Sequence, residues 1–190
     1  MSSIRLSART RLLDAAARLF YANGIAATGI DAVITEAGVA KKSLYNNFAS
    51  KDDLVAQYIE QRHEEWLDLY RQRAVAARHP RERVLAVFDA YLDHASMAYP
   101  QGFRGCGLLN AAAELPVGSA GRIATAQHKA EVERMLRDDL SQVTDADAAA
   151  ALAEHLSFLL EGAMARAGVE GEPRRLQRAR VIAEQLLDAL

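Results

Sequence analysis

A short segment, residues 41–47, carries the side chains whose types and spacing best suit a specific recognition chemistry. It reads Lys-Lys-Ser-Leu-Tyr-Asn-Asn, so amines, a hydroxyl and amides gather within about two helical turns. Asparagine can hydrogen-bond to the edge of adenine in the DNA major groove, and lysine can reach guanine or phosphate. Leu44 and Phe48, four residues apart, give the same stretch an apolar back. The pattern predicts a short amphipathic helix whose front offers to DNA the side chains of Lys41, Lys42, Ser43, Asn46 and Asn47.

Residues that could support catalysis or bind a metal are present but scattered. The five histidines, at positions 63, 79, 94, 128 and 155, include no pair three or four residues apart, so no helix would carry a two-histidine metal site. The sequence has neither a glycine-rich phosphate loop nor a nucleophile elbow. Cys106 could be paired with the distant His128, but a buried or pocket-lining thiol is the favoured interpretation. We therefore expect no catalytic site, no metal site, no cofactor and no enzymatic activity.

The elements that would position the DNA-reading helix are visible just before it. A second short helix precedes it, and Thr28 can cap its beginning. Its inward positions are Ile30, Val33, Ile34 and Ala37. Gly38 breaks this helix, because glycine tolerates the positive φ of a tight turn, and Val39 can fill the space between the two helices. Two helices joined by a turn of three or four residues containing glycine form a helix-turn-helix unit.

The whole chain is predicted to be all-α. Alanine is abundant, strand-type alternation is absent, and apolar residues recur at spacings of three and four. Ser7 and Ser50 are N-cap candidates, Gly24 can stop the first helix, and Pro80 can end the fourth. We expect about nine helices, over 7–22, a short stretch after Thr28, 41–47, 51–78, 81–98, 103–114, 120–141, from 144 or 145 to 167, and a last one after a turn at 168–173.

Charge is distributed unevenly along the chain. Residues 1–51 contain seven basic and three acidic residues and the remainder 16 and 22, so the formal net charge of −2 divides into +4 and −6. A local positive face is enough to attract phosphate, although chance asymmetry is an alternative.

No apolar run reaches the ~18 residues of a membrane span, the first residues lack the apolar core of a secretory signal, and the single cysteine cannot form an intrachain disulfide. A cytoplasmic protein is the simplest interpretation.

These features resemble the tetracycline-repressor (TetR) family of regulators over about residues 9–55. The resemblance is carried by Ala15, Ala16, Leu19, Phe20, Gly24, Thr28, Ile30, the run Glu36-Ala37-Gly38-Val39, the run from Lys41 to Phe48, Ser50, Lys51 and Leu54. It implies phosphate contacts from Thr28, Tyr45 and Lys51, and base or phosphate contacts from Lys41, Lys42, Ser43 and Asn46. Tyr45 could instead be a half-buried core aromatic, and Lys51 an ordinary surface lysine.

Two positions depart from the family pattern. Ile34 stands where the family usually has alanine, which would slightly alter the packing among the first three helices. Asn47 replaces a frequent aromatic that often touches phosphate, so the family contact at that position does not transfer directly.

The last two predicted helices have apolar faces that are wider than packing within a single chain requires. Pairing with the same helices of a second copy would form a four-helix interface, which is also the family's way of dimerising. The candidates for this interface are Leu152, Leu156, Leu159, Ala163, Ile182 and Leu186. The alternative is that both helices pack only within one chain.

The resemblance also implies a ligand pocket, and aromatic and soft side chains indicate where it would lie. The candidates are Trp66, Tyr70, Phe88, Tyr91, Leu92, Phe103, Cys106, Asn110 and Glu114. Asn110 and Glu114 share one helix face because they are four residues apart. Apolar walls with a few convergent polar groups are typical of small-molecule sites, although each of these residues could equally belong to a packed core.

The sequence thus predicts a ligand-responsive transcription regulator, most simply a repressor. Residues 1–50 would form the DNA-binding helix-turn-helix domain, and residues 51–190 the ligand-binding and dimerisation domain. The homodimer would bind a palindromic operator and be released by a small hydrophobic or amphipathic effector, with no membrane partner. Two rivals are a helix-turn-helix adaptor without a ligand and a protein-interaction bundle, the latter leaving the basic face unexplained.

Overall fold

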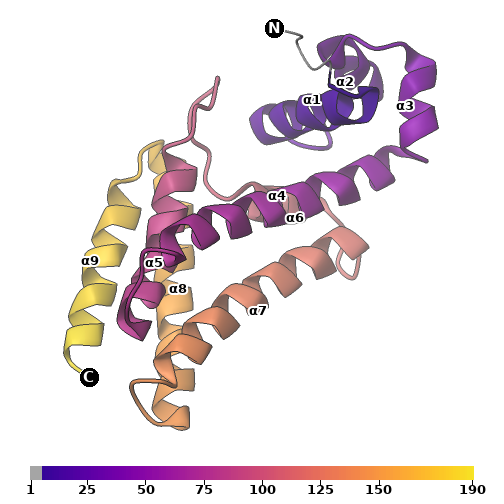
Figure 1. The fold of residues 1–190 in the computed structure, drawn as a ribbon. Coiled ribbons are helices and arrows are strands. Elements are labelled where there is room, and N and C mark those ends of the chain that lie inside the picture. The colour runs from indigo at the N-terminus through magenta and orange to yellow at the C-terminus, as the bar shows by residue number, and fades with distance from the viewer. Residues whose placement is uncertain (1–5) are drawn as a thin grey trace, which may run out of the picture. The chain divides into compact units, whose positions relative to one another are not determined.

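The computed structural model describes residues 6–190, and over this range it contains nine α-helices and no β-strand (Figure 1). The all-α prediction is therefore confirmed. Arg5, one of the seven basic residues of the first 51, lies outside the described range. None of the helices in residues 6–190 is both long and apolar enough to cross a membrane. The helices are α1 (Ala8–Asn23), α2 (Ile30–Ala37), α3 (Lys41–Asn47), α4 (Lys51–Ala74), α5 (Pro80–Ala95), α6 (Gly107–Glu114), α7 (Ala120–Leu140), α8 (Ala146–Glu170) and α9 (Arg174–Asp188).

Several helix ends follow the capping residues read from the sequence. The Ser7 hydroxyl accepts a hydrogen bond of 3.0 Å from the backbone amide three residues later, and α1 stops at Gly24 with φ +89°. At the start of α4, the backbone amide of Asp53 donates to the Ser50 hydroxyl at 3.1 Å. In return, the Asp53 carboxylate accepts from the backbone amide of Ala49 at 2.9 Å. This reciprocal pair resembles a capping box and satisfies amides that the helix itself leaves unpaired.

The junction between α4 and α5 differs from the prediction. We expected α4 to continue to residue 78 with Pro80 as its stop, but α4 ends at Ala74 and Pro80 is the first residue of α5. Proline suits that position because its missing amide would have no helical partner there. The ring also disfavours helical geometry in the preceding residue, and His79 is accordingly extended.

Two further boundaries were also predicted wrongly, and glycine explains both. Helix α6 begins at Gly107 instead of 103, because Gly105 adopts a positive φ of +82° that interrupts the helix. Helix α8 continues to Glu170 and is ended by Gly171, which has a left-handed conformation. Gly168 is therefore helical, and a Cβ built on it would lie 2.7 Å from the Cα of Gly105. It serves close backbone packing and does not form a turn.

The described chain folds as two compact units whose boundaries cross α4 and α7. One, which we call the head unit, contains the residues up to Arg62 together with Gly107–Thr125. The other, the body unit, contains His63–Cys106 and Ala126–Leu190. The functional division that we placed at residue 50 stays a prediction, and the compact head unit extends beyond that residue.

The head unit is organised around α1. Helices α2, α3 and α6 all pack against α1, and α2 also contacts α3 (Figure 1). The ring of Phe20 meets that of Tyr58 edge to face at 5.5 Å. Burial of each large apolar side chain contributes about 1.5–3 kcal/mol. The fully or almost fully buried side chains include Leu12, Phe20, Val33, Leu44, Phe48, Leu54 and Tyr58.

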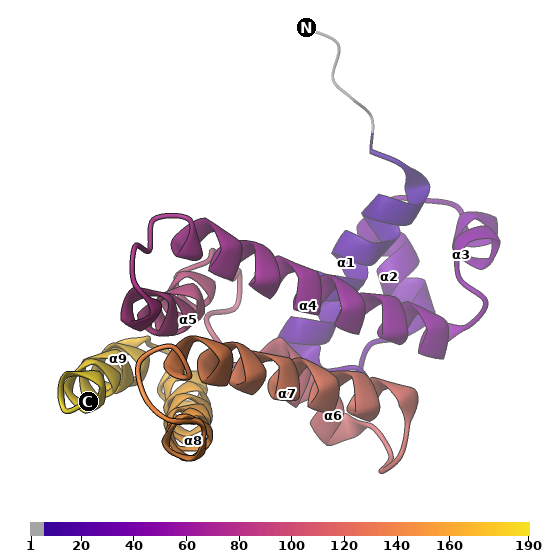
Figure 2. The same ribbon diagram turned by 60° about the horizontal axis from the view of Figure 1, so that its bottom comes forward.

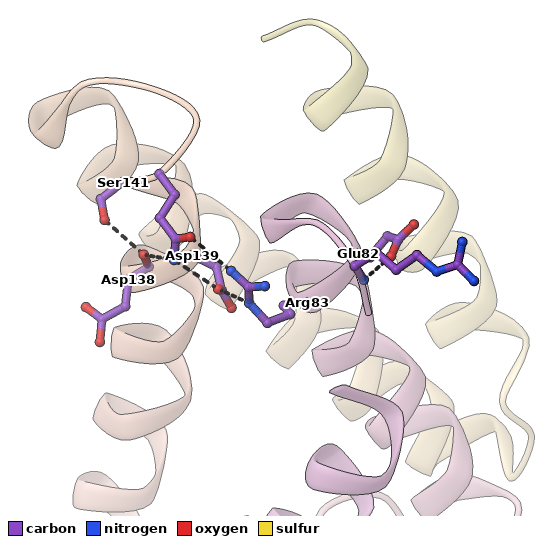
Figure 3. Close-up of polar contacts among 7 residues, drawn as sticks. Glu82, Arg83, Asp138, Asp139 and Ser141 are labelled. Atoms are coloured by element: carbon purple, nitrogen blue, oxygen red, sulfur yellow. Dashed lines mark hydrogen bonds and ion pairs between the residues drawn. The ribbon is translucent and has the colours of Figure 1, made fainter. Parts of the chain in front are cut away.

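In the body unit, α9 packs against both α5 and α8, and Figure 2 shows α8 and α9 side by side. An ion pair between Arg83 on α5 and Asp139 on α7 is shown in Figure 3, with Gln142 accepting a second bond from Arg83 at 3.0 Å. Arg180 on α9 pairs with Asp89 on α5 at 2.6 Å. The core of the unit includes Phe88, Tyr91, Leu136, Leu156, Leu160, Met164 and Leu187.

Candidate nucleic-acid interface

The turn between α2 and α3 has the conformation that a helix-turn-helix requires. Gly38 is left-handed, with φ +59° and ψ +42°, as the sequence predicted. The amide of Val39 donates to the carbonyl of Ile34 at 3.3 Å, which closes the end of α2. The guanidinium of Arg11, on α1, donates to the carbonyl of Gly38 at 2.8 Å. The turn is therefore fixed both from within and by α1.

Helix α3 has the two faces that its sequence predicted. Leu44 is fully buried and Phe48 almost so, which anchors the back of the helix to the head unit. The front, which we call the α3 front, is solvent-exposed and consists of Lys41, Lys42, Tyr45 and Asn46. Tyr45 is thus at the surface, and the alternative of a half-buried core aromatic is wrong. An exposed row of amines, an amide and a phenol can exchange water for phosphate and base edges.

Two side chains of the predicted DNA-binding set, those of Lys41 and Asn47, have partners on or next to α3 within the head unit. The ammonium of Lys41 pairs with the Asp31 carboxylate at 2.9 Å, which raises the pKa of Lys41 through the hydrogen bond and the charge of that carboxylate. The amide of Asn47 donates to the carbonyl of Ser43 at 2.6 Å, one helical turn back, and both residues are half-buried. Lys42, Tyr45 and Asn46 therefore remain the most accessible members of the set.

The structure places Thr28 and Lys51 differently from the sequence expectation. Thr28 is only 3% exposed, and its hydroxyl donates to the carbonyl of Gly24 at 2.7 Å. The N-cap of α2 is Gly29, without a side-chain bond, so the prediction that Thr28 caps this helix is wrong. The ammonium of Lys51 donates to the carbonyl of Ile25 at 2.6 Å. Both side chains hold the loop between α1 and α2, and their phosphate contacts stay predictions.

Sequence reasoning named Glu114 but missed its role in holding this loop. The carboxylate of Glu114, at the end of α6, accepts hydrogen bonds from the backbone amides of Ile25 at 3.0 Å and Ala26 at 2.7 Å. Its two oxygens thus bind consecutive amides, which is the geometry of a strong charge-assisted contact. We interpreted Glu114 as a pocket residue, but the structure places it in the head unit as a clamp on the loop. No local sequence pattern marks such a contact, because its partners lie far away in the chain.

The remaining pocket candidates fall into two groups. Asn110 belongs to the head unit with Glu114, and the other seven belong to the body unit. Among these, Trp66 has its ring centroid 5.9 Å from that of Tyr70 and 5.2 Å from that of Tyr91. Trp66, Phe88, Tyr91, Phe103 and Cys106 are buried, whereas Tyr70 and Leu92 are half-buried.

The structure adds to this aromatic group two histidines that the sequence did not assign to the pocket. His128 on α7 meets Trp66 edge to face at 5.3 Å, and its Nδ1 lies 2.9 Å from that of His63. Burial lowers the pKa of His128 to about 3, with the adjacent Lys129 and His63 adding to the shift. This histidine is therefore neutral at physiological pH. Periodicity could have placed it on the inner face of α7, but it could not have predicted these neighbours.

The predicted dimer candidates divide by exposure. Leu156 is fully buried and Ala163 nearly so within their own chain, so neither side chain offers surface to a second copy. Leu152, Leu159, Ile182 and Leu186 are half-buried. The sequence reasoning missed Phe158, which lies on the outer face of α8 with 66% of its surface exposed.

The fold and the α3 front together define a helix-turn-helix protein of the all-α class that binds DNA. Residues 12–58 match the family model described as bacterial regulatory proteins, tetR family. The chain is 33% identical to a TetR-family transcriptional regulator of known structure from Streptomyces coelicolor, with a TM-score of 0.86 and coverage of 96% of this chain and 95% of the other. A TetR-type regulator structure from Streptomyces avermitilis is 31% identical, with a TM-score of 0.75 and coverage of 94% and 99%. The chain therefore belongs to the TetR family and is a transcriptional regulator.

One curated relative matches over a shorter stretch. The chain is 32% identical over 94 residues to the HTH-type transcriptional activator FasR of Mycolicibacterium smegmatis. The match spans 48% of this chain and 43% of that relative.

Proposed function

We propose that this regulator binds a palindromic DNA operator as a homodimer and represses transcription until a small molecule releases it from the DNA. The observation that carries the proposal is the α3 front, where Lys42, Tyr45 and Asn46 stay exposed after a rigid glycine turn. One such helix makes too few base contacts for useful specificity. Two heads placed about one DNA turn apart would read the two halves of a palindrome.

Dimerisation is supported by the outer face of α8. Phe158 is exposed there, and Leu152 and Leu159 on the same helix are half-buried, so a second copy would cover apolar side chains. Two copies of α8 and α9 would bury them in a four-helix interface. Because a two-fold interface uses the same patch on both copies, one substitution changes both sides of it.

The test combines DNA selection with sizing. Selection of bound fragments from a random DNA pool should return a palindrome, and light scattering should give a dimer at micromolar concentration. Phe158→Asp should yield a monomer that binds this palindrome much more weakly, because it places a carboxylate in the apolar interface. Val117→Asp is the matched control, since Val117 is exposed in the head unit and should tolerate the same change. A wild-type monomer, or a Phe158→Asp dimer, would overturn the dimer.

The effector part of the proposal rests on the aromatic group around Trp66 in the body unit. Apolar walls with a few polar atoms suit a small hydrophobic or amphipathic ligand. A thermal-shift screen of such compounds should find stabilising ligands, and Trp66→Ala and Tyr70→Ala should weaken both their binding and their release of DNA. If neither variant changed ligand affinity or DNA release, the proposed site would be wrong. Failure of every compound to shift the melting would favour an adaptor without a ligand.

Activation is a second candidate, because the relative from Mycolicibacterium smegmatis is named an activator. The α3 front would be the same in either case, since DNA binding precedes both outcomes. In-vitro transcription from a promoter that carries the selected palindrome separates the two. Repression predicts less transcript when the protein is added, and activation predicts more.

A further inference from the structure

An ion pair joins the two helices of the helix-turn-helix at the edge of the α3 front. The ammonium of Lys41, the first residue of α3, lies 2.9 Å from Oδ1 of Asp31, the second residue of α2. The side chains of Lys41 and Asp31 are 61% and 82% exposed. The first turns of both helices therefore present a hydrogen-bond donor and an acceptor side by side to solvent.

Stability of the fold does not account for this pair. Exposed ion pairs contribute little to stability, because water solvates each charge well and the pairing orders two side chains. The turn between the helices is already fixed by Gly38 and by the bond from Arg11 to its carbonyl. Phosphate also repels a carboxylate, so an acid beside the α3 front opposes DNA binding unless it bonds to a base.

Both side chains can form further hydrogen bonds while they stay paired. An ammonium has three donor hydrogens and a carboxylate has two acceptor oxygens, whereas the pair uses one hydrogen of Lys41 and Oδ1 of Asp31. Asp31 also lies in the first turn of α2, where the positive end of the helix dipole favours a carboxylate. The pair thus offers donors and acceptors at fixed neighbouring places.

The major-groove edge of a G·C base pair has the complementary arrangement. Guanine presents the acceptors N7 and O6, and cytosine presents its N4 amino donor beside O6. Because O6 and N4 are bonded to each other, they are separated by an ordinary hydrogen-bond length of about 2.9 Å. The distance between Nζ of Lys41 and Oδ1 of Asp31 is also 2.9 Å. An ammonium placed over guanine therefore brings the carboxylate over cytosine.

An A·T base pair fits the same ion pair less well. It also has a donor beside an acceptor, the N6 amino group of adenine and O4 of thymine. In that base pair, however, the carboxylate would lie next to the acceptor N7 of adenine, and the ammonium next to the methyl group of thymine. One contact is repulsive and the other hinders solvation of a charge, so the ion pair discriminates in favour of G·C.

We propose that Asp31 and Lys41 together read one G·C base pair in each half-site of the operator. The ammonium donates to O6 and N7 of guanine, and the carboxylate accepts from the N4 amino group of cytosine. This inference rests on the proposed function, because it requires DNA on the α3 front. The position of Lys41 supports it, since residues at the start of a recognition helix are those that contact base edges.

The test measures base preference at each position of the site that wild type selects from random DNA. Wild type, Asp31→Ala and Lys41→Ala are titrated by fluorescence anisotropy with this site and with every single base-pair substitution of it. At one G·C position of each half-site, substitution should lower wild-type affinity about 10-fold to 100-fold. In each variant the same substitution should lower affinity only about two-fold to three-fold, because half of the reading pair is gone. Both variants should lose their preference at the same position.

A phosphate contact of Lys41 predicts a different result. Lys41→Ala would then weaken binding to every sequence by the same factor, and Asp31→Ala would leave base preferences unchanged. Either result would overturn the shared reading, as would loss of preference at two different positions. Glu36→Ala is the matched control, because Glu36 is an exposed acid of α2 that pairs at 3.0 Å with Arg18 of α1 instead of with α3. It should keep every preference of wild type, and urea unfolding establishes that each variant is folded.

The selection itself separates this inference from the proposed function. A wild-type protein that recovers no specific sequence would overturn both. A specific site that is not a palindrome would contradict binding as a homodimer, while the base preferences of the variants still decide the role of the ion pair. A palindrome without a G·C position sensitive to both variants would overturn the inference and leave the proposed function intact.

Discussion

The α3 front differs from the polar group around Lys129 of α7, whose ammonium pairs with Glu161 of α8 and donates to Tyr91 of α5, in how it holds polar side chains. On α3, Lys42, Tyr45 and Asn46 are exposed, and the fold depends on the other face of the helix. In the body unit, Tyr91 is buried and Lys129 half-buried, and the two are bonded to each other from different helices. Exposed groups can exchange water for DNA without leaving a buried atom unpaired, whereas enclosed groups are part of the packing. Changes on α3 should therefore alter binding at constant stability, and changes in the body unit should alter stability itself.

The strongest test of this comparison is removal of the accessible donors of α3. Lys42→Ala combined with Asn46→Ala should lower affinity for the selected palindrome about 100-fold or more, because each base or phosphate contact contributes about 1–3 kcal/mol and the dimer loses both sets. The free energy of unfolding should stay within about 0.5 kcal/mol of wild type, as for most surface substitutions. Fluorescence anisotropy and urea unfolding measure the two quantities. Arg78→Ala, an exposed change of charge in the body unit, is the control and should leave DNA affinity unchanged. A stability loss in the α3 variant would break the comparison.

The buried side chain of His128 makes the stability of the protein depend on pH. Because burial lowers the pKa of His128 to about 3, the folded chain keeps this residue neutral while the unfolded chain takes up a proton below pH about 6.5. The contribution to stability is complete above pH 6.5 and is lost progressively as the pH falls towards 3. Between pH 7 and 4.5 it should amount to about 2–3 kcal/mol of unfolding free energy.

His128→Gln isolates this contribution from that of the other titrating groups. Urea unfolding at the two pH values should show a smaller loss in the variant than in wild type, by the amount given above. The charged or titratable groups that act on His128 are Lys129, His63 and His94, with Glu131 3.6 Å from His63, and they remain in both proteins. The control is His155→Gln, at an exposed position of α8. Equal losses in wild type and His128→Gln would show that His128 takes up its proton without unfolding.

The turn at Gly38 is intermediate between the exposed α3 front and the buried groups of the body unit. It is exposed, but its left-handed backbone favours glycine. Gly38→Ala should lower the free energy of unfolding by about 1–2 kcal/mol, the cost of a left-handed backbone for a residue with a Cβ. The new Cβ would also lie 2.9 Å from the Arg11 guanidinium and displace its bond to the turn. Gly29→Ala is the matched control, since Gly29 has an ordinary φ of −79° and open space around it. Thermal melts that moved equally for both variants would contradict a special role for the turn.

The parts of the fold that local sequence determines were predicted correctly. The Gly38 turn, the Ser7 cap and the two faces of α3 depend on residues within one or two helical turns, and the structure has all three. The role of Glu114 and the contacts of Lys129 depend on residues far away in the chain, and no periodicity specifies such pairs. The Pro80 error belongs to an intermediate case, because proline is compatible with the end of one helix and with the start of the next.

Substitution of Glu114 should have the smallest effect on stability. It tests whether a long-range contact adds to what the local sequence supplies. Glu114→Gln keeps the shape of the side chain but removes its charge and one of its two acceptor oxygens, so one amide of the loop loses its partner. The free energy of unfolding should fall by only about 1 kcal/mol, because the site is exposed and water can replace the lost bond. Hydrogen exchange gives the sharper readout, since protection of the Ile25 and Ala26 amides should fall while that of the α1 amides stays unchanged. Glu60→Gln, an exposed change on α4 within the head unit, should alter neither. Full protection of both amides in Glu114→Gln would mean that Lys51 and Thr28 alone hold the loop, and that the long-range clamp adds nothing to what the local sequence supplies.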